Sequence, residues 1–217
     1  MGESHTTGEE PRTEGRYEAL EAWLRAVFAV ESLDYRWSAQ DYTTVDSVPY
    51  VGRSPLLDRT LVATGFAKWG LSGGTAAALM LGDLIAGRDN PWLELFDARR
   101  VADARAVGRL PKENVLVGGR WLADRLGRLR PGALEHLGPG EAGVVEVDGR
   151  AVGAYRHPDG RVEAVSVACS HMGCDVRWNG AERSWDCPCH GSRFATDGRV
   201  LDGPAVDPLE PVLVERA

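Results

Sequence analysis

Apolar side chains in the first half of the chain recur with the period of an α-helix. The range Tyr17–Phe28 predicts a helix with one apolar face, made of Leu20, Leu24, Val27 and Phe28. A second helix is predicted from Ser72, which suits the N-cap position, to about Ile85, with Gly87 as its end. The same period over Trp121–Leu129 predicts a third helix.

Two short strands are predicted between these helices, over Glu31–Trp37 and Leu61–Thr64. The stretch Trp69–Gly82 carries no charge, but its 14 residues are fewer than the roughly 20 that span a membrane. We therefore interpret it as a buried helix and predict no membrane anchor in this chain. Together these helices and strands indicate an α+β first half.

The pattern changes to a period of two after Gly143, where small apolar residues alternate along the chain at Val145, Val147, Val152, Ala154, Val165 and Val167. Residue pairs that favour tight hairpin turns punctuate this stretch: Asp148-Gly149, Asp159-Gly160, Asn179-Gly180 and Asp197-Gly198. The preceding segment, Arg128–Gly143, is rich in proline and glycine and reads as a linker. We therefore divide the chain into residues 1–136 and a small antiparallel β-domain, residues 137–217.

Composition and charge exclude several classes of protein. The 217 residues include 32 acidic and 25 basic side chains, and a net charge of −7 argues against a nucleic-acid partner, which requires a basic surface. The polar, acidic N-terminus lacks the basic and apolar regions of a secretory signal, so we predict a cytoplasmic location. The β-domain holds most of the excess negative charge, as a solvated face or a docking surface for a basic redox partner.

All four cysteines lie between Cys169 and Cys189, with two histidines among them. The two segments read CSHMGC from residue 169 and CPCHGS from residue 187. Each segment supplies a thiol and an imidazole at the spacing of metal ligands. Gly173, Pro188 and Gly191 allow backbone amides to turn toward a charged centre.

Several kinds of site contain cysteine and histidine. A structural zinc ion would use two of each but would leave two cysteines without a role. Two disulfides would make the histidines coincidental, and free core cysteines do not suit such glycine-rich loops. The Cys-Pro-Cys segment also differs from the Cys-x-x-Cys of thiol oxidoreductases. A two-iron cluster, with a cysteine pair on one iron and a histidine pair on the other, uses four residues and leaves two cysteines to connect the loops.

Residues 140–212 resemble a Rieske [2Fe–2S] domain, because the patterns C-x-H-x-G-C and C-P-C-H-G-S are both complete. The resemblance implies that Cys169 and Cys187 ligate an inner iron, and that His171 and His190 ligate an outer iron near the surface. Neutral imidazoles then replace two anionic thiolates, so adding an electron is easier and the reduction potential rises. The outer imidazoles can also change protonation with the redox state.

The resemblance also implies roles for residues around the cluster. Cys174 and Cys189 correspond to a disulfide that links the two loops, and Ser192 corresponds to a serine that donates to a bridging sulfide. Respiratory members have a tyrosine two positions later that donates to a cysteine sulfur, whereas this chain has Phe194. Because hydrogen bonds to the sulfurs raise the potential, we predict a value below that of the respiratory type.

The class of Rieske protein depends on what accompanies the domain. The membrane anchor of the cytochrome bc subunit is not found, and the 27 residues after His190 are too few for the catalytic domain of a ring-hydroxylating oxygenase. Residues 1–136 instead resemble the C-terminal part of an FAD-dependent oxidoreductase of the amino-acid-oxidase type. The segments that carry this resemblance are Arg36–Arg53 and Leu61–Gly87.

In that family a strand ending in Thr-Gly leads into a helix whose positive N-terminus faces the flavin pyrimidine edge. The resemblance places seven residues at this edge: Gly65, Phe66, Lys68, Trp69, Gly70, Leu71 and Ser72. The family's opening G-x-G-x-x-G unit is not found, since the match at Gly138–Gly143 contains a proline and leads into a strand. We therefore expect the chain to be a fragment that does not bind FAD stably by itself.

Together these observations predict electron transfer through a Rieske-type [2Fe–2S] cluster. The resemblance implies that the chain is the C-terminal portion of a partial FAD-oxidoreductase fold whose intact parent oxidises an amine or amino acid. The expected partner is a redox protein or a flavin domain, and the chain alone is an oxidoreductase component and not a complete enzyme. The alternatives are a non-redox zinc-binding structural module and a flavin-binding oxidoreductase completed by another chain.

Overall fold

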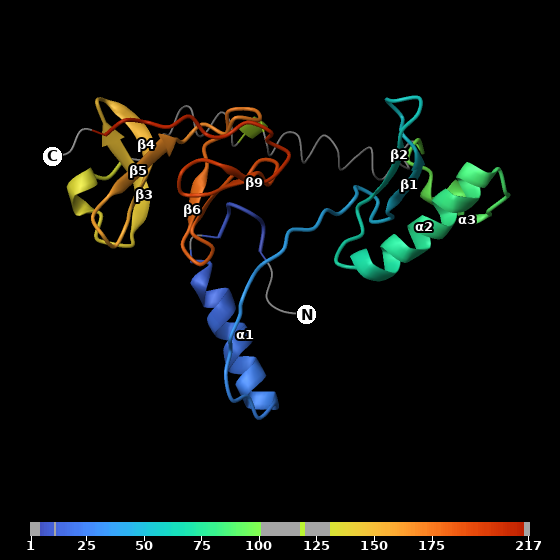
Figure 1. Ribbon diagram of the computed structural model, residues 1–217, viewed down its shortest axis with the longest axis horizontal. Helices are drawn as coiled ribbons and strands as arrows, with labels where there is room; N and C mark the ends of the chain where they lie inside the picture. Colours follow the sequence, from blue (N-terminus) through green and yellow to red (C-terminus); the bar gives the residue numbers. More distant parts are fainter. Residues whose placement is uncertain (1–4, 11, 101–117, 120–130, 215–217) are drawn as a thin grey trace. The chain divides into compact units, whose positions relative to one another are not determined.

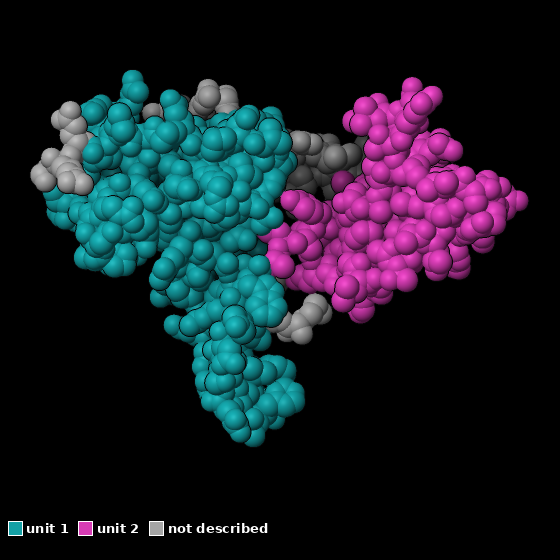
Figure 2. Space-filling view, viewed as in Figure 1, with its two compact units in different colours: residues 1–38, 117–217 teal, residues 39–116 magenta. Residues whose placement is uncertain are grey.

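The computed structural model describes residues 5–10, 12–100, 118–119 and 131–214, and the chain divides into two compact units (Figure 2). Unit 1 comprises residues 1–38 and 117–217, and unit 2 comprises residues 39–116. This division differs from the predicted one because residues 1–38 belong to the same unit as the β-domain. The predicted helix over Trp121–Leu129 lies outside the described residues. No described helix is both long and apolar enough to cross a membrane.

The first sheet of unit 1 has the order β3-β4-β5 and is antiparallel throughout, as the sequence predicted (Figure 1). Its strands are β3 (Ala142–Val147), β4 (Arg150–Arg156) and β5 (Val162–Ser166). The predicted Asp148-Gly149 turn joins β3 to β4, with positive φ at both residues. Val152–Tyr155 in β4 are all buried, because this central strand is covered on both faces, so the expected alternation of buried and exposed residues breaks there.

The second sheet of unit 1 has the order β6-β7-β8-β9 and is also antiparallel. Its short strands are β6 (Arg177–Asn179), β7 (Ser184–Asp186), β8 (Arg193–Phe194) and β9 (Val200–Asp202). The expected tight turn at Asn179-Gly180 is wrong, because the turn occupies residues 180–183 and positive φ falls on Arg183. Asn179 instead ends β6 and uses its side chain to accept a hydrogen bond from the N–H of Glu182.

The two sheets meet around Trp185, which is fully buried. A Cβ atom on Gly153 of β4 would lie 3.1 Å from the indole ring, so glycine allows the ring to lie closely against that strand. Tyr155 of β4 stacks on Trp178 of β6 with ring centroids 5.5 Å apart. The aromatic core therefore fixes the second sheet against the first.

The predicted linker is partly built into the β-domain. From Pro131 onward it is described, and the N–H of Gly132 donates to the carbonyl of Val144 over 2.9 Å. A short 3-10 helix, η1 (Leu134–His136), follows. Strand β3 then begins inside the predicted linker segment. Residues 131–143 thus belong to the domain that they precede.

The first predicted helix is confirmed as α1 (Glu14–Val27), but none of its residues is buried. Much of its predicted apolar face is exposed: Val27 and Phe28 retain 54% and 56% of their accessible surface. The predicted strand over Glu31–Trp37 is wrong, because the segment pairs with no described strand and Tyr35 is 85% exposed. Aromatic and apolar residues alone do not make a strand where no neighbouring strand offers hydrogen bonds.

The described part of unit 2, residues 39–100, contains a two-stranded antiparallel sheet and two helices. The sheet pairs β1 (Tyr50–Arg53) with β2 (Leu61–Thr64), and β2 matches its predicted range. The helices are α2 (Gly70–Ala86) and α3 (Trp92–Phe96). The secondary structure of this unit is α+β, whereas its resemblance to a flavoprotein stays a prediction.

The start of α2 differs from the prediction. The helix begins at Gly70, after a turn in which the N–H of Trp69 donates to the carbonyl of Phe66 over 2.9 Å. Ser72 is therefore inside the helix and is not its N-cap, and its hydroxyl donates to the carbonyl of Trp69. The helix ends at Gly87 with φ of 67°, as predicted. Only Ala77 and Met80 are buried, so the expected buried helix is buried on one face alone.

A bidentate ion pair holds unit 2 together, and it leads to a pH-dependent prediction. The guanidinium of Arg100 contacts both carboxylate oxygens of Asp46 at 2.9 Å and lies 4.1 Å from the ring centre of Tyr50. These hydrogen bonds lower the pKa of Asp46 to about 2. A lowered carboxyl pKa stabilises the fold above the unfolded pKa of 3.8, and this stabilisation is lost as the pH falls toward 2.

We expect Asp46→Asn to lower the free energy of unfolding by about 1–2 kcal/mol at pH 7, and to have little effect near pH 2. Urea denaturation of the full chain at both pH values measures the difference. Asp58→Asn, at an exposed position of the same unit, serves as the control. An equal loss at both pH values would contradict the role of the carboxylate charge.

Candidate metal centre

Two six-residue loops with matching backbone geometry form the candidate site. The first loop is Cys169–Cys174 and the second loop is Cys187–Ser192. In each, the N–H of the first residue donates to the carbonyl of the sixth, and the N–H of the fifth donates to the carbonyl of the first, over 2.8 to 3.0 Å. The fifth residues, Gly173 and Gly191, have φ of 74° and 81°. Glycine is favoured there because other side chains rarely adopt this conformation.

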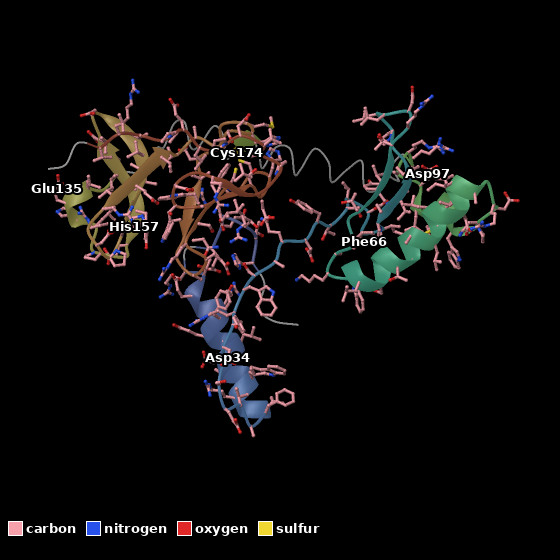
Figure 3. All side chains as sticks on the ribbon, in the orientation of Figure 1. Asp34, Phe66, Asp97, Glu135, His157 and Cys174 are labelled. Carbon is pink, nitrogen blue, oxygen red and sulfur yellow. A yellow bond between two sulfur atoms is a disulfide. The ribbon has the colours of Figure 1, made fainter. Side chains whose placement is uncertain are left out.

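The two loops are joined by a disulfide between Cys174 and Cys189, with an S–S distance of 2.06 Å. Figure 3 labels Cys174 in this region. This is the pairing that the family resemblance implied, and it leaves Cys169 and Cys187 as buried free thiols. The four cysteines thus divide into one covalent link and one pair of available sulfur ligands.

The two free thiols share one buried environment. The Cys187 thiol and the backbone amides of His171 and Met172 donate to the Cys169 sulfur, which lowers the pKa of Cys169 to about 6. The same pairing, together with burial, raises the pKa of Cys187. One thiolate is therefore stabilised, and a second beside it requires a positive charge. A bound metal group supplies that charge, so the sulfur pair fits a metal site.

The two histidines form the second pair of candidate ligands. The rings of His171 and His190 are nearly perpendicular, with centroids 4.9 Å apart. Burial and the neighbouring His171 lower the pKa of His190, which favours the neutral imidazole that binds metals. Nδ1 of His190 is buried and has no hydrogen-bond partner among the described residues. A metal ion would provide the partner that this nitrogen lacks.

The distances between the four candidate ligands distinguish a site for a single metal ion from a site for a two-metal cluster. Among the residues that the structure describes, three cysteine, histidine or carboxylate donors within 4.8 Å of one another occur at Cys174, Cys187 and Cys189 only. Two of these sulfurs form the disulfide. Tetrahedral zinc with Zn–S bonds of about 2.3 Å would hold four ligand atoms within about 3.8 Å of each other. The sulfur pair and imidazole pair do not converge in this way, which favours a group with two metal ions.

The residues next to the ligands are buried and contribute hydrogen bonds. The hydroxyl of Ser192 donates to the Cys169 sulfur and accepts from the N–H of Ala205 over 3.0 Å. Pro188 is buried in the second loop, and Phe194 is fully buried in the core that contains Cys169 and Cys187. Ser192 is therefore directed at a ligand sulfur, whereas Phe194 supplies only packing.

A third loop, residues 203–208, was missed by sequence reasoning. It begins with a cis peptide bond between Gly203 and Pro204. Its Ala205 N–H bonds to Ser192 in the second loop, and the hydroxyl of Ser170 in the first loop donates to the carbonyl of Asp207 over 2.6 Å. The third loop thus holds both others. The only sequence signal was a pair of X–Pro steps, which mark a turn and not a function.

The residues predicted to face a flavin lie in unit 2, around the connection from β2 to α2. A pocket of about 820 Å³ opens there, with a largely apolar lining that includes Leu79, Trp92 and Phe96. Four of the seven predicted residues line it: Gly65, Phe66, Trp69 and Ser72. The other three, Lys68, Gly70 and Leu71, are not among its lining residues. The structure thus gathers part of the predicted set around one cavity.

Comparison with known proteins gives one family match and several relatives. The Rieske [2Fe-2S] domain family matches residues 131–213. The "Putative Rieske 2Fe-2S iron-sulfur protein YhfW" of Bacillus subtilis (strain 168) is 38% identical over 213 residues, covering 97% of this chain and 42% of the relative. Cytochrome b6-f complex iron-sulfur subunit 1 of Synechocystis sp. is 45% identical over 58 residues, covering 26% of this chain and 33% of the relative.

Among solved structures, the cyanobacterial plasma membrane Rieske protein PetC3 from Synechocystis PCC 6803 is 35% identical, with a TM-score of 0.31. The match covers 34% of this chain and 74% of that one. The present chain spans less than half the length of both curated relatives described above. Residues 131–213 nevertheless combine the family's sequence pattern with paired cysteines, paired histidines and a disulfide between their loops. Residues 131–213 are therefore a Rieske [2Fe-2S] domain, and such a domain holds a [2Fe–2S] cluster.

Proposed function

We propose that this chain transfers single electrons through a [2Fe–2S] cluster held by the first and second loops. The observation that carries the proposal is the arrangement of the free side chains into a buried sulfur pair and a more exposed imidazole pair. When bound, the cluster accepts and releases one electron at a time. The protein excludes water from the sulfur side, while the imidazole side lies near solvent.

The exposed side of the site suits contact with a redox partner. His171 is exposed, and Met172 beside it retains 60% of its surface, which is high for an apolar side chain. The Synechocystis relative is named as a subunit of the cytochrome b6-f complex. We propose that a partner protein docks at this side. The predicted cytoplasmic location stays a prediction.

Metal and sulfide analysis of the purified chain tests this function. We expect about two iron atoms and two acid-labile sulfides per chain, with a rhombic paramagnetic resonance signal after reduction. Met172→Ala is a suitable control, because it changes an exposed side chain and keeps the backbone amide that donates to Cys169. A colourless protein with one zinc ion would show that the site is structural.

Because position 194 holds phenylalanine, we expect a tyrosine there to raise the reduction potential of the cluster. Phe194→Tyr adds a hydroxyl at a fully buried position in the core of the cluster cysteines. A hydrogen bond worth about 1 kcal/mol more to the reduced state would raise a one-electron potential by roughly 40 mV. Redox titration measures the shift. If the variant keeps its cluster and the potential does not rise, the missing-donor interpretation is wrong.

A second proposal concerns the parent protein. We propose that the chain is the C-terminal portion of an FAD-dependent oxidoreductase that acts on an amine or amino acid. The supporting observation is the apolar pocket of unit 2, which contains Gly65 and Trp69 from the predicted flavin-facing set. The Bacillus relative, which is matched along 97% of this chain, is more than twice as long and leaves room for such a parent.

Flavin binding tests the second proposal. Protein purified with its natural partners should release FAD on denaturation, whereas the isolated chain should bind FAD weakly. Replacing Trp69 with alanine should weaken binding further, since a large aromatic wall of the pocket is removed. The absence of flavin in the partnered protein, together with no binding at about 1 mM FAD, would reject the proposal.

A further inference from the structure

The sheet β6–β9 has one face toward the cluster and a second face that is polar and buried at its centre. Cross-strand register places Trp178, Trp185 and Phe194 on one face, with the cluster cysteines. The other face carries a row of alternating charges across the four strands: Arg177, Asp186, Arg193 and Asp202. Asp186 and Arg193 are only 2% and 7% exposed. Charged side chains are this deeply buried only where they are paired and where other residues exclude water from them. Another part of the chain must therefore cover the centre of this face.

The cover comes from the beginning of the chain. We call residues 5–10 and 12–17 the N-terminal segment; α1 begins within it, beside the turn after β6 (Figure 1). The hydroxyl of Thr13, which is 4% exposed, donates to the Asn179 side-chain oxygen over 2.7 Å and accepts from the N–H of Ala181 over 3.2 Å. Tyr17 donates to the carboxylate of Glu182. These contacts join residues more than 160 positions apart.

The same contacts continue to the second loop. The side-chain NH₂ of Asn179 donates to Asp186 over 2.8 Å. The carboxylate of Asp186 also accepts from Ser184 over 2.7 Å and from Arg193 over 3.3 Å. Asp186 directly precedes Cys187, and Arg193 directly follows Ser192. The hydrogen-bonded path from Thr13 therefore ends on the two residues that flank the second loop.

Gly8 makes a second and closer contact with this loop. Its φ is +70°, and a Cβ atom there would lie 2.7 Å from the Pro188 nitrogen and 2.9 Å from the Asp186 carbonyl oxygen. Both are backbone atoms, so they cannot move aside as the end of a side chain can. Arg177 also donates to the carbonyl of Gly8 over 3.4 Å. The N-terminal segment thus lies directly against the start of the second loop.

We propose that the polar face of β6–β9 is a docking site for the N-terminal segment of this chain. In this interface Gly8 and Thr13 are positioning residues for the second loop, which carries Cys187 and His190. The Rieske domain is then completed by residues that lie more than 110 positions before it in the sequence. The docking therefore joins residues 5–17 to the Rieske domain by non-covalent contacts, in addition to the covalent connection through the chain. The docking does not depend on the proposed electron transfer, although its effect on the cluster does.

Two pairs of variants in the full chain test this proposal. Gly8→Ala introduces both the backbone overlap and the unfavourable φ, whereas Gly15→Ala adds the same methyl group where no atom lies within 4 Å. Thr13→Val removes the hydroxyl with little change in shape, and Thr13→Ser keeps it. Hydrogen–deuterium exchange of the peptides that cover residues 177–194 is the first measurement. The reduction potential and paramagnetic resonance spectrum of the loaded protein are the second.

We expect exchange in residues 177–194 to rise about tenfold or more in Gly8→Ala and Thr13→Val, and to stay at the wild-type rate in Gly15→Ala and Thr13→Ser. The potential or the spectrum should change in the same two variants only. Equal exchange in Gly8→Ala and Gly15→Ala, or no effect of Thr13→Val, would overturn the docking. Increased exchange with an unchanged potential and spectrum would overturn the positioning role. A chain without iron would reject electron transfer, while the exchange data would still decide the docking.

Discussion

Replacing His171 and His190 together with cysteine is expected to lower the reduction potential of the cluster by several hundred millivolts. The two imidazoles are neutral ligands, and two thiolates in their place add two negative charges to the centre. An electron is then harder to add. Plant-type ferredoxins, whose clusters have four cysteine ligands, have reduction potentials of about −400 mV. Rieske centres have reduction potentials of about −150 to +300 mV. The size of the fall makes this the strongest test of the ligand assignment.

The pH dependence of the potential should disappear in the same variant. In the wild-type protein an added electron favours protons on metal-bound imidazoles, so the potential should fall as the pH rises. Redox titration between about pH 6 and pH 10 compares the two proteins. Met172→Ala is the control, since Met172 directly follows His171 in the first loop without being a ligand. A variant that keeps a rhombic spectrum and a pH-dependent potential would show that other residues hold the outer iron.

The candidate site could be predicted from the sequence because its parts are local. Each loop is six residues long, and its glycine, ligands and disulfide cysteine occupy fixed positions within it. Each loop is also closed by its own backbone hydrogen bonds, so its pattern can be recognised within six residues. The antiparallel strands around it were predictable for the same reason, since the Asp148-Gly149 turn sets the register of β3 against β4.

Contacts between distant parts of the chain could not be predicted. Asn179 looked like a turn residue, but in the structure its side chain bonds to Thr13, 166 positions earlier, and the turn moves to residues 180–183. The sequence does not indicate the third loop, because Ala205 contributes its backbone N–H, which any residue other than proline would provide. Side-chain identity carries no signal for such a role.

Some local patterns were misleading because they describe side chains and not their neighbours. Glu31–Trp37 contains residues that favour strands, yet it remains unpaired and exposed. Much of the apolar face of α1 and of α2 is likewise exposed, including Val27 and Leu71. Hydrophobic periodicity predicted the presence of α1 and α2, but it could not say what covers them.

Removing the disulfide by the double replacement of Cys174 and Cys189 with serine is expected to lower the free energy of unfolding by about 3 kcal/mol. The bond closes a loop across 15 positions, and most of its effect comes from restricting the unfolded chain. Slow amides of β4 and β7 should report this loss for the Rieske domain alone, because their exchange requires the domain to open. A reductant should destabilise the wild-type protein by the same amount and leave the variant unchanged.

The third loop is hydrogen-bonded to the same two loops that the disulfide joins. It therefore affects how far the free energy of unfolding falls when the disulfide is removed. If the hydrogen bonds of Ser170 and Ser192 to the third loop already fix both loops, the double replacement should cost well under 1 kcal/mol, and the entropic estimate would be wrong. Adding Ser192→Ala to the double variant separates the two cases. Losses that add indicate independent links, whereas a much larger combined loss shows that the disulfide and the third loop substitute for each other.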